Sequence, residues 1–428
     1  MPDYAMKDIY NRGEYETGIE YASNPDVRAS FTEWDYLFLS KCIYKLKKYS
    51  EYLNVYKEFH NKYPESNLLD DNMGWCLYHT HIKKFNYETG NKQQYFKQID
   101  YILSHCTDSV YSPKVYIATL AADNIIKQKL GVNPNYEQAD KYLSLLNPLQ
   151  LELTEHKNLV DERIIKTASD REKWYNHKTK VLVELKEYEK CLKYIDEAFK
   201  NVDHFHNNCN YWLNYRKALC YMGLDDIDTA EEIIKSILNK FEHWCFYEAL
   251  FKISVRRGNA DEALRYGALC ATSDRDHKLR VTFYVKFAEF LLNNGYESEA
   301  ALHYKLVEII RDEESWKGIR LPDGFSYPSD VAAMDKKSVI RQLEKFWNIE
   351  KERGIDFYEG IISKILPNGK SGFISDNSGK SYYFNVRDFT KKVYELNEGI
   401  KVRYALAERL DRAKNEVKLN AVQISFVK

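Results

Sequence analysis

The sequence predicts a mainly α-helical chain that ends in a small all-β domain. Up to about residue 354, apolar residues recur at the three- and four-residue spacing of amphipathic helices. From Ile355 onward, short β-branched and aromatic runs alternate with Gly, Asn and Asp. A chain of 428 residues is also long for one hydrophobic core. We therefore expect helices over 1–312, a loop and connecting helix over 313–354, and a β domain over 355–428.

Small and apolar residues in the helical part repeat at fixed offsets. Ala218 and Tyr221 precede Ala230, Ile234 and Ile237, so a second small residue follows the first after twelve positions. Less regular copies of this pattern occupy 40–64, 139–146, 191–198, 263–270 and 288–307. The series resembles tetratricopeptide repeats, whose period is about 34 residues. This resemblance implies an α-solenoid of helical hairpins over most of 30–312, and a solenoid with less regular repeats is the alternative.

Short glycine-containing turns separate the two helices of several hairpins. They lie at 222–226, 257–261 and 294–298. Glycine there is expected to take the left-handed conformation that ends a helix, and the Asp or Ser that follows is expected to cap the next one. After the array, 313–334 is expected to be loop, and 335–353 an amphipathic helix with Val339, Leu343, Phe346, Trp347 and Ile349 on its apolar stripe.

The tetratricopeptide resemblance also implies a groove lined by the first helix of each hairpin. Trp34 and Trp212 fall near the start of such helices, and Tyr215 lies one turn after Trp212. Aromatic side chains in a groove can anchor a protein partner. The alternative is that they pack between repeats.

Five strands are expected in the C-terminal part from the alternation of apolar and polar residues. They cover 359–364, 371–376, 381–386, 401–407 and 418–426. Gly379 suits the positive φ of a hairpin turn between the second and third strands.

The segments 360–374, 381–389, 396–402 and 419–424 together resemble a cold-shock domain, an OB-type barrel that binds single-stranded nucleic acid. The resemblance implies that Phe373 and Tyr383 stack on bases. Asn385 stands in place of the family's His, while Val386, Ser371, Lys364 and Ile365 replace family aromatics. Because several stacking positions are lost, the expected binding is weak and sequence-tolerant. Phosphate contacts are expected from Lys364, Lys370, Lys380 and Arg387.

Charge adds little to that expectation. The whole chain carries a net charge of −1, with 30% charged residues. Residues 355–428 contain 13 Lys and Arg against 9 Asp and Glu, a net of +4. This is far below the charge of a strong nucleic-acid binder.

The expected compartment is the cytoplasm. Eight cysteines form no CxxC pair and five of them sit among apolar residues, as in a reducing environment. The first residues lack the apolar stretch of a signal peptide, and no apolar run reaches the roughly 18 residues that span a bilayer. No metal or cofactor is expected, since the i,i+2 histidine pairs at 79–81 and 204–206 face different sides of a helix.

We expect a non-enzymatic adaptor that binds a protein partner and touches single-stranded RNA or DNA. No glycine-rich phosphate loop is present in the sequence. One alternative is a helical ribonuclease that uses Arg171 and His177, which have the Arg-x5-His spacing of some helical ribonucleases. Another is a purely protein-binding scaffold. The oligomeric state is not assigned.

Overall fold

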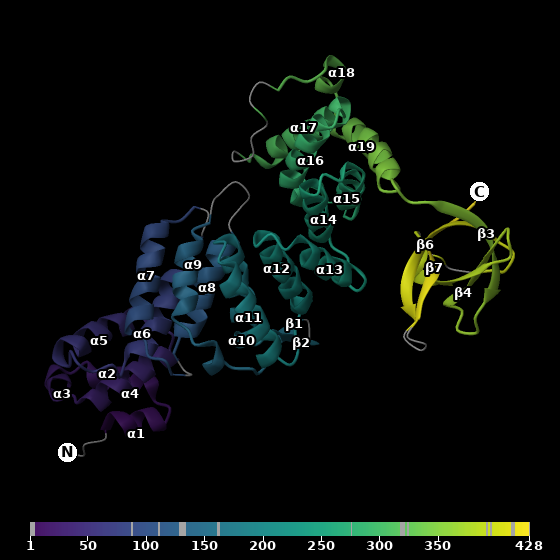
Figure 1. The fold of residues 1–428 in the computed structure, drawn as a ribbon. Helices are drawn as coiled ribbons and strands as arrows, with labels where there is room; N and C mark the ends of the chain where they lie inside the picture. Colours follow the sequence, from purple (N-terminus) through teal and green to yellow (C-terminus); the bar gives the residue numbers. More distant parts are fainter. Residues whose placement is uncertain are drawn as a thin grey trace. The chain divides into compact units, whose positions relative to one another are not determined.

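The structure is a computed structural model, and it describes residues 5–86, 89–109, 112–127, 134–160, 163–274, 276–316, 322, 325–390, 393, 396–411 and 416–427 (Figure 1). The chain divides into two compact units. Unit 1 comprises Met1–Ala249 and Glu308–Phe325, and unit 2 comprises Leu250–Val307 and Ser326–Lys428. Two helices contribute residues to both units: α14 (Trp244–Arg256) and α17 (Glu297–Glu314).

Unit 1 is built mainly from helices. In chain order they are α1 (Ala5–Asn11), α2 (Tyr15–Ala22), α3 (Pro25–Ala29), α4 (Glu33–Lys45), α5 (Tyr49–Lys62), α6 (Asp70–Leu77), the π-helical turn η1 (Tyr78–Ile82), α7 (Lys92–His105), α8 (Lys114–Ile126), α9 (Tyr136–Ser144), the 3-10 turn η2 (Pro148–Gln150), α10 (Asp170–Glu184), α11 (Tyr188–Asn201), α12 (Cys209–Gly223) and α13 (Ile227–Leu238). An antiparallel β-hairpin of β1 (His156–Val160) and β2 (Arg163–Thr167) precedes α10.

Consecutive helices of unit 1 pack as hairpins. α4 packs on α5, α8 on α9, α10 on α11, and α12 on α13. The first helices of neighbouring hairpins also pack side by side, α8 on α10 and α10 on α12 (Figure 1). This arrangement confirms the predicted helical-hairpin array.

The small repeat residues lie where helices meet. Ala139, Cys191, Ala218 and Ala230 have no exposed surface. Since each position is closed on all sides, a larger side chain there would force two helices apart. This explains why a twelve-residue spacing of small residues identifies the hairpins.

The prediction for the turn at 222–226 was wrong about which residue is left-handed. Asp225 has φ +67°, whereas Gly223 is still part of α12. A Cβ on Gly223 would lie 2.3 Å from the Tyr188 ring, so this glycine allows close packing rather than a turn. Gly258 and Gly295 do take positive φ, at +70° and +83°. In the turn at 257–261, the cap of the next helix comes earlier than predicted. Asn259, rather than Asp261, caps α15 (Ala260–Thr272).

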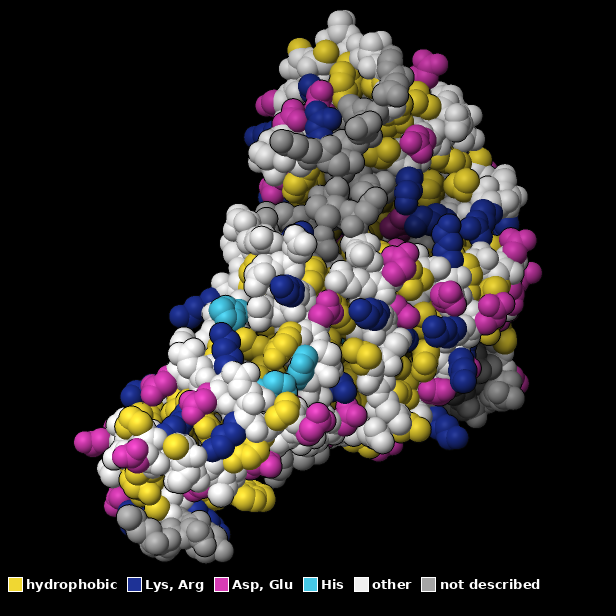
Figure 2. Space-filling view, turned by 90° about the vertical axis from the view of Figure 1, so that its left-hand side faces the viewer, with side chains coloured by type: hydrophobic (Ala, Val, Ile, Leu, Met, Phe, Trp, Pro, Cys, Tyr) yellow, Lys and Arg dark blue, Asp and Glu magenta, His cyan; other side chains and the backbone are white. Residues whose placement is uncertain are grey.

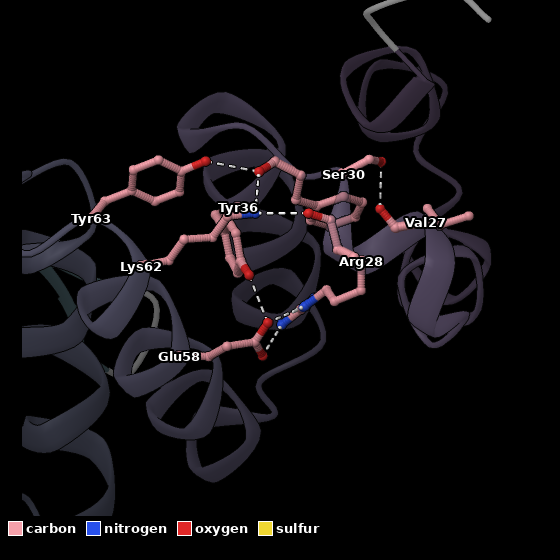
Figure 3. A network of polar contacts seen from close by, with 9 residues as sticks. Val27, Arg28, Ser30, Tyr36, Glu58, Lys62 and Tyr63 are labelled. Atoms are coloured by element: carbon pink, nitrogen blue, oxygen red, sulfur yellow. Dashed lines mark hydrogen bonds and ion pairs between the residues drawn. The ribbon is translucent and has the colours of Figure 1, made fainter.

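A polar network fastens the short helix α3 to α4 and α5 (Figure 3). The Arg28 guanidinium donates two hydrogen bonds of 2.9 Å to the Glu58 carboxylate. Tyr36 donates to the same carboxylate at 2.6 Å, and burial followed by this bond raises the pKa of Tyr36 to about 12. Lys62 Nζ and the Tyr63 hydroxyl donate to the Phe31 carbonyl, each at 2.9 Å. These bonds hold the start of the array together.

Unit 2 combines helices with the C-terminal barrel. Besides its shares of α14 and α17, its helices are α15, the 3-10 turn η3 (His277–Arg280), α16 (Val281–Asn293), α18 (Ser329–Ala332) and α19 (Lys336–Glu350). α19 packs against α15 and confirms the predicted helix at 335–353. Its stripe was predicted too wide, however, because Ile349 is 70% exposed while Leu343 and Trp347 are buried.

The segment predicted as loop at 313–334 is only partly so. α17 continues to Glu314, and α18 lies inside the segment. Residues 317–321, 323 and 324 of the predicted loop lie outside the described residues.

The last strands close into a barrel with neighbour order β3-β4-β5-β7-β6, in which β6 also pairs with β3. Their bounds are β3 (Phe357–Ile365), β4 (Ser371–Asp376), β5 (Ser381–Asn385), β6 (Lys401–Asp411) and β7 (Glu416–Phe426). All five predicted strands are present, and Gly379 takes the predicted positive φ of +84°. The predicted fold class, a helical array followed by a small β-barrel, is confirmed.

The barrel has its own hydrophobic core. Ile362, Ile374, Phe384, Val402 and Ile424 have no exposed surface. Gly372 lies against β3, where a Cβ would come within 2.3 Å of the Lys364 carbonyl oxygen. Along β5, buried residues alternate with less buried ones, so one side of this strand faces the core and the other faces outward. In β4, Ser371, Gly372 and Ile374 are buried and the other residues are half-buried.

Candidate functional site

A cavity of about 460 Å³ lies in unit 1, on helices α8, α10 and α12 and at Cys245 in α14. Trp212 and Tyr215 both line it. These helices are the first members of their hairpins, so the cavity opens on the side where the sequence predicted a groove. A volume of this size is in the range of ligand pockets in proteins. We call this cavity the array pocket.

The aromatic wall of the array pocket is rigidly packed. Trp212 and Tyr215 meet edge to face, with ring centroids 6.0 Å apart. Behind them, Trp212 also contacts His243 at 4.8 Å and Phe246 at 5.7 Å between ring centroids. Both rings remain half-buried. They therefore pack against aromatic neighbours and line the pocket at the same time, and their role in binding a partner stays a prediction.

Arg216 places a buried positive charge beside these rings. Arg216 is only 9% exposed, and it also lines the array pocket. Its guanidinium donates to Asn176 Oδ1 at 2.7 Å and to Thr179 Oγ1 at 3.2 Å, both neutral acceptors. Among the described residues no carboxylate contacts it. Burial lowers the pKa of Arg216, because the surroundings disfavour its charged form.

Lys180 on α10 adds a second cation to the lining of the array pocket. Desolvation by the pocket lowers the pKa of Lys180, and the positive charge of Arg216 lowers it further. Within the described residues Lys180 makes no hydrogen bond or ion pair, although Glu184, one turn later, also lines the pocket. The two cations thus share one cavity without a bound counter-charge from the described chain.

Asp123 on α8, which also lines the array pocket, already has cationic partners. Lys127 Nζ lies 2.7 Å from its carboxylate, and His177 Nε2 lies 3.0 Å away. Burial alone would raise the pKa of Asp123, but hydrogen bonds from His177 and Lys127 outweigh it and leave the pKa lowered. His177 also holds the Lys173 carbonyl through Nδ1 at 2.7 Å.

The two residues of the ribonuclease alternative have separate partners. Arg171 donates to the carbonyl oxygens of Leu149 and Leu151 at 2.7 and 2.9 Å, whereas His177 bonds Asp123 in the array pocket. Arg171 does not line that pocket. The structure therefore does not bring this pair together around one phosphate.

Trp34, the third predicted groove residue, lies outside the array pocket. It is on α4 and is 63% exposed. Sequence reasoning also missed the cations of the pocket. A signal for Arg216 was present, because it lies three residues after Leu213 and four before Cys220, which are both fully buried. A charged residue in a core register has to be explained by a partner or a ligand.

The second candidate surface is the outer face of the barrel. Lys364, Phe373, Tyr383 and Asn420 are direct cross-strand neighbours on β3, β4, β5 and β7. Directly opposed residues share one face of a sheet, so the four side chains form a row. The Phe373 and Tyr383 rings are half-buried and meet edge to face with centroids 5.8 Å apart. We call this set the barrel row.

The other predicted barrel residues lie around this row rather than in it. Asn385 Oδ1 accepts the Arg387 N–H at 3.0 Å and so caps the turn η4 (Val386–Asp388), which leaves the exposed Arg387 side chain outside the strand. Lys370 is exposed in the loop before β4. Lys380 lies over Tyr382, with Nζ 5.3 Å from a ring that belongs to the opposite side of β5. Of the predicted cations, only Lys364 is in the row.

The place of one lost aromatic is filled by a loop. Ser371 is almost fully buried, and its Oγ hydrogen-bonds Asn368 at 3.1 Å. This contact lies two residues before Phe373 on the same strand. On the face of the molecule drawn in Figure 2, basic, acidic and hydrophobic side chains are interspersed, and several Lys and Arg side chains gather at the upper right of the view.

In the described part of the chain, no group of three or more His, Cys, Asp or Glu side chains has a metal-binding arrangement. No helix there combines the length and the apolarity required to cross a bilayer.

The fold and the array pocket define a helical-repeat protein that carries a C-terminal β-barrel. No protein-family model matches the chain, and no curated protein does. Solved structures similar to it include a tetratricopeptide repeat protein from Parabacteroides merdae, with 16% identity over 78% of this chain and 98% of that one, at a TM-score of 0.39. Another is the C-terminal part of a tetratricopeptide repeat protein from Cytophaga hutchinsonii, with 14% identity over 70% of this chain and 97% of that one, at a TM-score of 0.29. A third is a Rap protein complexed with competence and sporulation factor, with 13% identity over 82% of this chain and 99% of that one, at a TM-score of 0.31.

Proposed function

We propose that this protein is a non-enzymatic adaptor whose helical array binds a protein partner in the array pocket. The observation that carries the proposal is the pocket itself, where Trp212 and Tyr215 stand beside the buried Arg216. Trp, Tyr and Arg are the residue types that dominate binding energy at protein interfaces. A partner side chain placed between them would be well packed and largely removed from water.

Photo-crosslinking tests the role of the array. Benzoylphenylalanine at position 212 is expected to crosslink a defined partner in cells. The matched control carries the same group at Phe199, which is 39% exposed on α11 and does not line the pocket. Identical products from both positions, or none from either, would contradict a partner in the pocket.

The second part of the proposal is that the barrel is of cold-shock type and contacts single-stranded RNA or DNA through the barrel row. Strand order and the adjacency of Phe373 and Tyr383 support it. Each base stacked on an aromatic contributes about 1–3 kcal/mol, so two rings support weak binding. Lys364 and, outside the row, Lys370 and Arg387 are the proposed phosphate contacts. Nucleic-acid binding by this row is measured by fluorescence polarisation of labelled single strands.

The proposed location is the cytoplasm, in keeping with eight free cysteines of which seven are buried. Burial raises the pKa of the Cys42 thiol to about 11 and that of Cys209 to about 12, so these thiols stay protonated and unreactive. They behave as small core residues in a reducing compartment.

A further inference from the structure

The array pocket carries more positive than negative charge. Lys127, Lys180 and Arg216 line it, against the carboxylates of Asp123 and Glu184. The Asp123 carboxylate is occupied by Lys127 and His177, at 2.7 and 3.0 Å. This leaves Arg216 and Lys180 as the cations available to a ligand, with the exposed Glu184 at the rim as their nearby negative charge.

Burial of the Arg216 charge lowers the stability of the fold unless a ligand compensates for it. A buried charge without a carboxylate partner destabilises a fold by several kcal/mol, and apolar residues of similar size usually avoid that cost. Here the guanidinium is held by Asn176 and Thr179, which fix its orientation but do not neutralise it. A fixed and uncompensated guanidinium is prepared to receive a carboxylate.

The surroundings of this charge are apolar. Trp212 and Tyr215 flank it on α12, and Ile126, Val183 and Leu219 line the same cavity. A ligand that offered only a carboxylate would leave the apolar lining exposed to water. A ligand with an aromatic or aliphatic group next to its carboxylate would bury that lining.

We propose that the array pocket recognises a segment of the partner that presents one Asp or Glu side chain next to an aromatic or aliphatic side chain. The carboxylate pairs with Arg216 and Lys180, and the apolar neighbour packs on Trp212 and Tyr215. This inference rests on the proposed function, since it specifies the chemistry of the partner that the array binds.

A peptide selection on the full chain tests the inference. The probe is a positional-scanning set of octapeptides that includes phosphoserine and phosphotyrosine, and the selected sequences are remade with Gln in place of Glu or Asn in place of Asp. Enrichment of an acidic residue beside an apolar one is expected, and the amide twin is expected to bind about tenfold more weakly.

Two variants locate the binding. Lys180→Gln removes a pocket charge from an exposed side chain, so folding is not at risk, and it is expected to weaken binding of the acidic peptide about two- to fivefold. Lys193→Gln makes the same charge change on α11, where the exposed Lys193 does not line the pocket, and it is expected to leave affinity unchanged.

The outcomes separate the inference from the proposed function. Selection of apolar peptides with no preference for acid, lost in Trp212→Ala, would overturn the inference while partner binding stands. A preference for phosphorylated residues, or displacement of the peptide by AMP, would overturn the carboxylate assignment. Selection of no peptide at all would count against both.

Discussion

At the scale of single residues, side chains in unusual environments mark where this fold has little freedom. Gly267 in α15 is one of them. A Cβ there would lie 2.4 Å from the Phe287 ring on α16, which is fully buried. Gly267→Ala should therefore destabilise the protein by about 1–3 kcal/mol, despite the better helix propensity of Ala. Chemical denaturation measures this, and a stabilised variant would show that the ring has room to move.

His303 makes folding sensitive to acid. Its Nε2 accepts the Trp347 N–H at 2.9 Å, so the imidazole must be neutral at that nitrogen. Burial lowers the pKa of His303 to about 4. In the unfolded chain the value returns to about 6.5, so the unfolded state binds more protons between these two values.

The free energy of unfolding therefore contains the full contribution of neutral His303 above a pH of about 6.5. That contribution, up to about 3 kcal/mol, is lost as the pH falls toward 4. Urea unfolding at several pH values measures the slope. His303→Gln keeps a neutral acceptor but does not titrate, so it should flatten the slope. Part of the pH dependence should remain in this variant, because burial and Arg280 also lower the pKa of His277 to about 4. Equal slopes in both proteins would refute the role of His303.

At the scale of elements, α19 shows how buried and exposed positions of one helix differ. Leu343 and Trp347 are buried, whereas Ile349 is 70% exposed. Leu343→Ala should cost about 2–5 kcal/mol because it leaves a cavity. Ile349→Ala should stay within about 0.5 kcal/mol. Thermal denaturation of the two variants provides the comparison, and equal losses would mean that Ile349 is covered in solution.

The same helix shows the limit of reading elements from sequence. Its existence followed from apolar periodicity, but periodicity alone assigned Ile349 to the buried stripe. The barrel strands were predictable because alternation along a strand such as β5 is a local property. Asp225 took the left-handed position expected of Gly223, since Tyr188 on a neighbouring helix needs the space of that glycine.

The residues of the candidate sites also differ in how far the sequence could predict them. Trp212 and Tyr215 were predictable because they lie on one turn of one helix. Arg216 and Lys180 were not, since their proximity depends on α10 packing on α12. Likewise, Arg171 and His177 looked like a pair in sequence, but Arg171 binds the carbonyls of 149 and 151 instead.

At the scale of the whole molecule, the two candidate sites lie in separate parts of the chain. The array pocket belongs to unit 1 and the barrel row to unit 2. We propose that the array selects a protein partner and that the barrel adds a weak, salt-sensitive contact to a single strand. The nucleic-acid contact is therefore the part of the adaptor proposal that a direct binding measurement can decide.

That measurement is fluorescence polarisation of labelled single-stranded RNA and DNA of about 12 nucleotides on the full chain, at about 50 and about 200 mM salt. We predict weak binding that decreases at the higher salt and falls at least about 30-fold in Phe373→Ala with Tyr383→Ala, because two stacks are lost. Tyr358→Ala, an exposed aromatic on β3 outside the barrel row, should bind as the unaltered chain does. Absence of binding at low salt, or equal affinity in the double variant, would contradict the account.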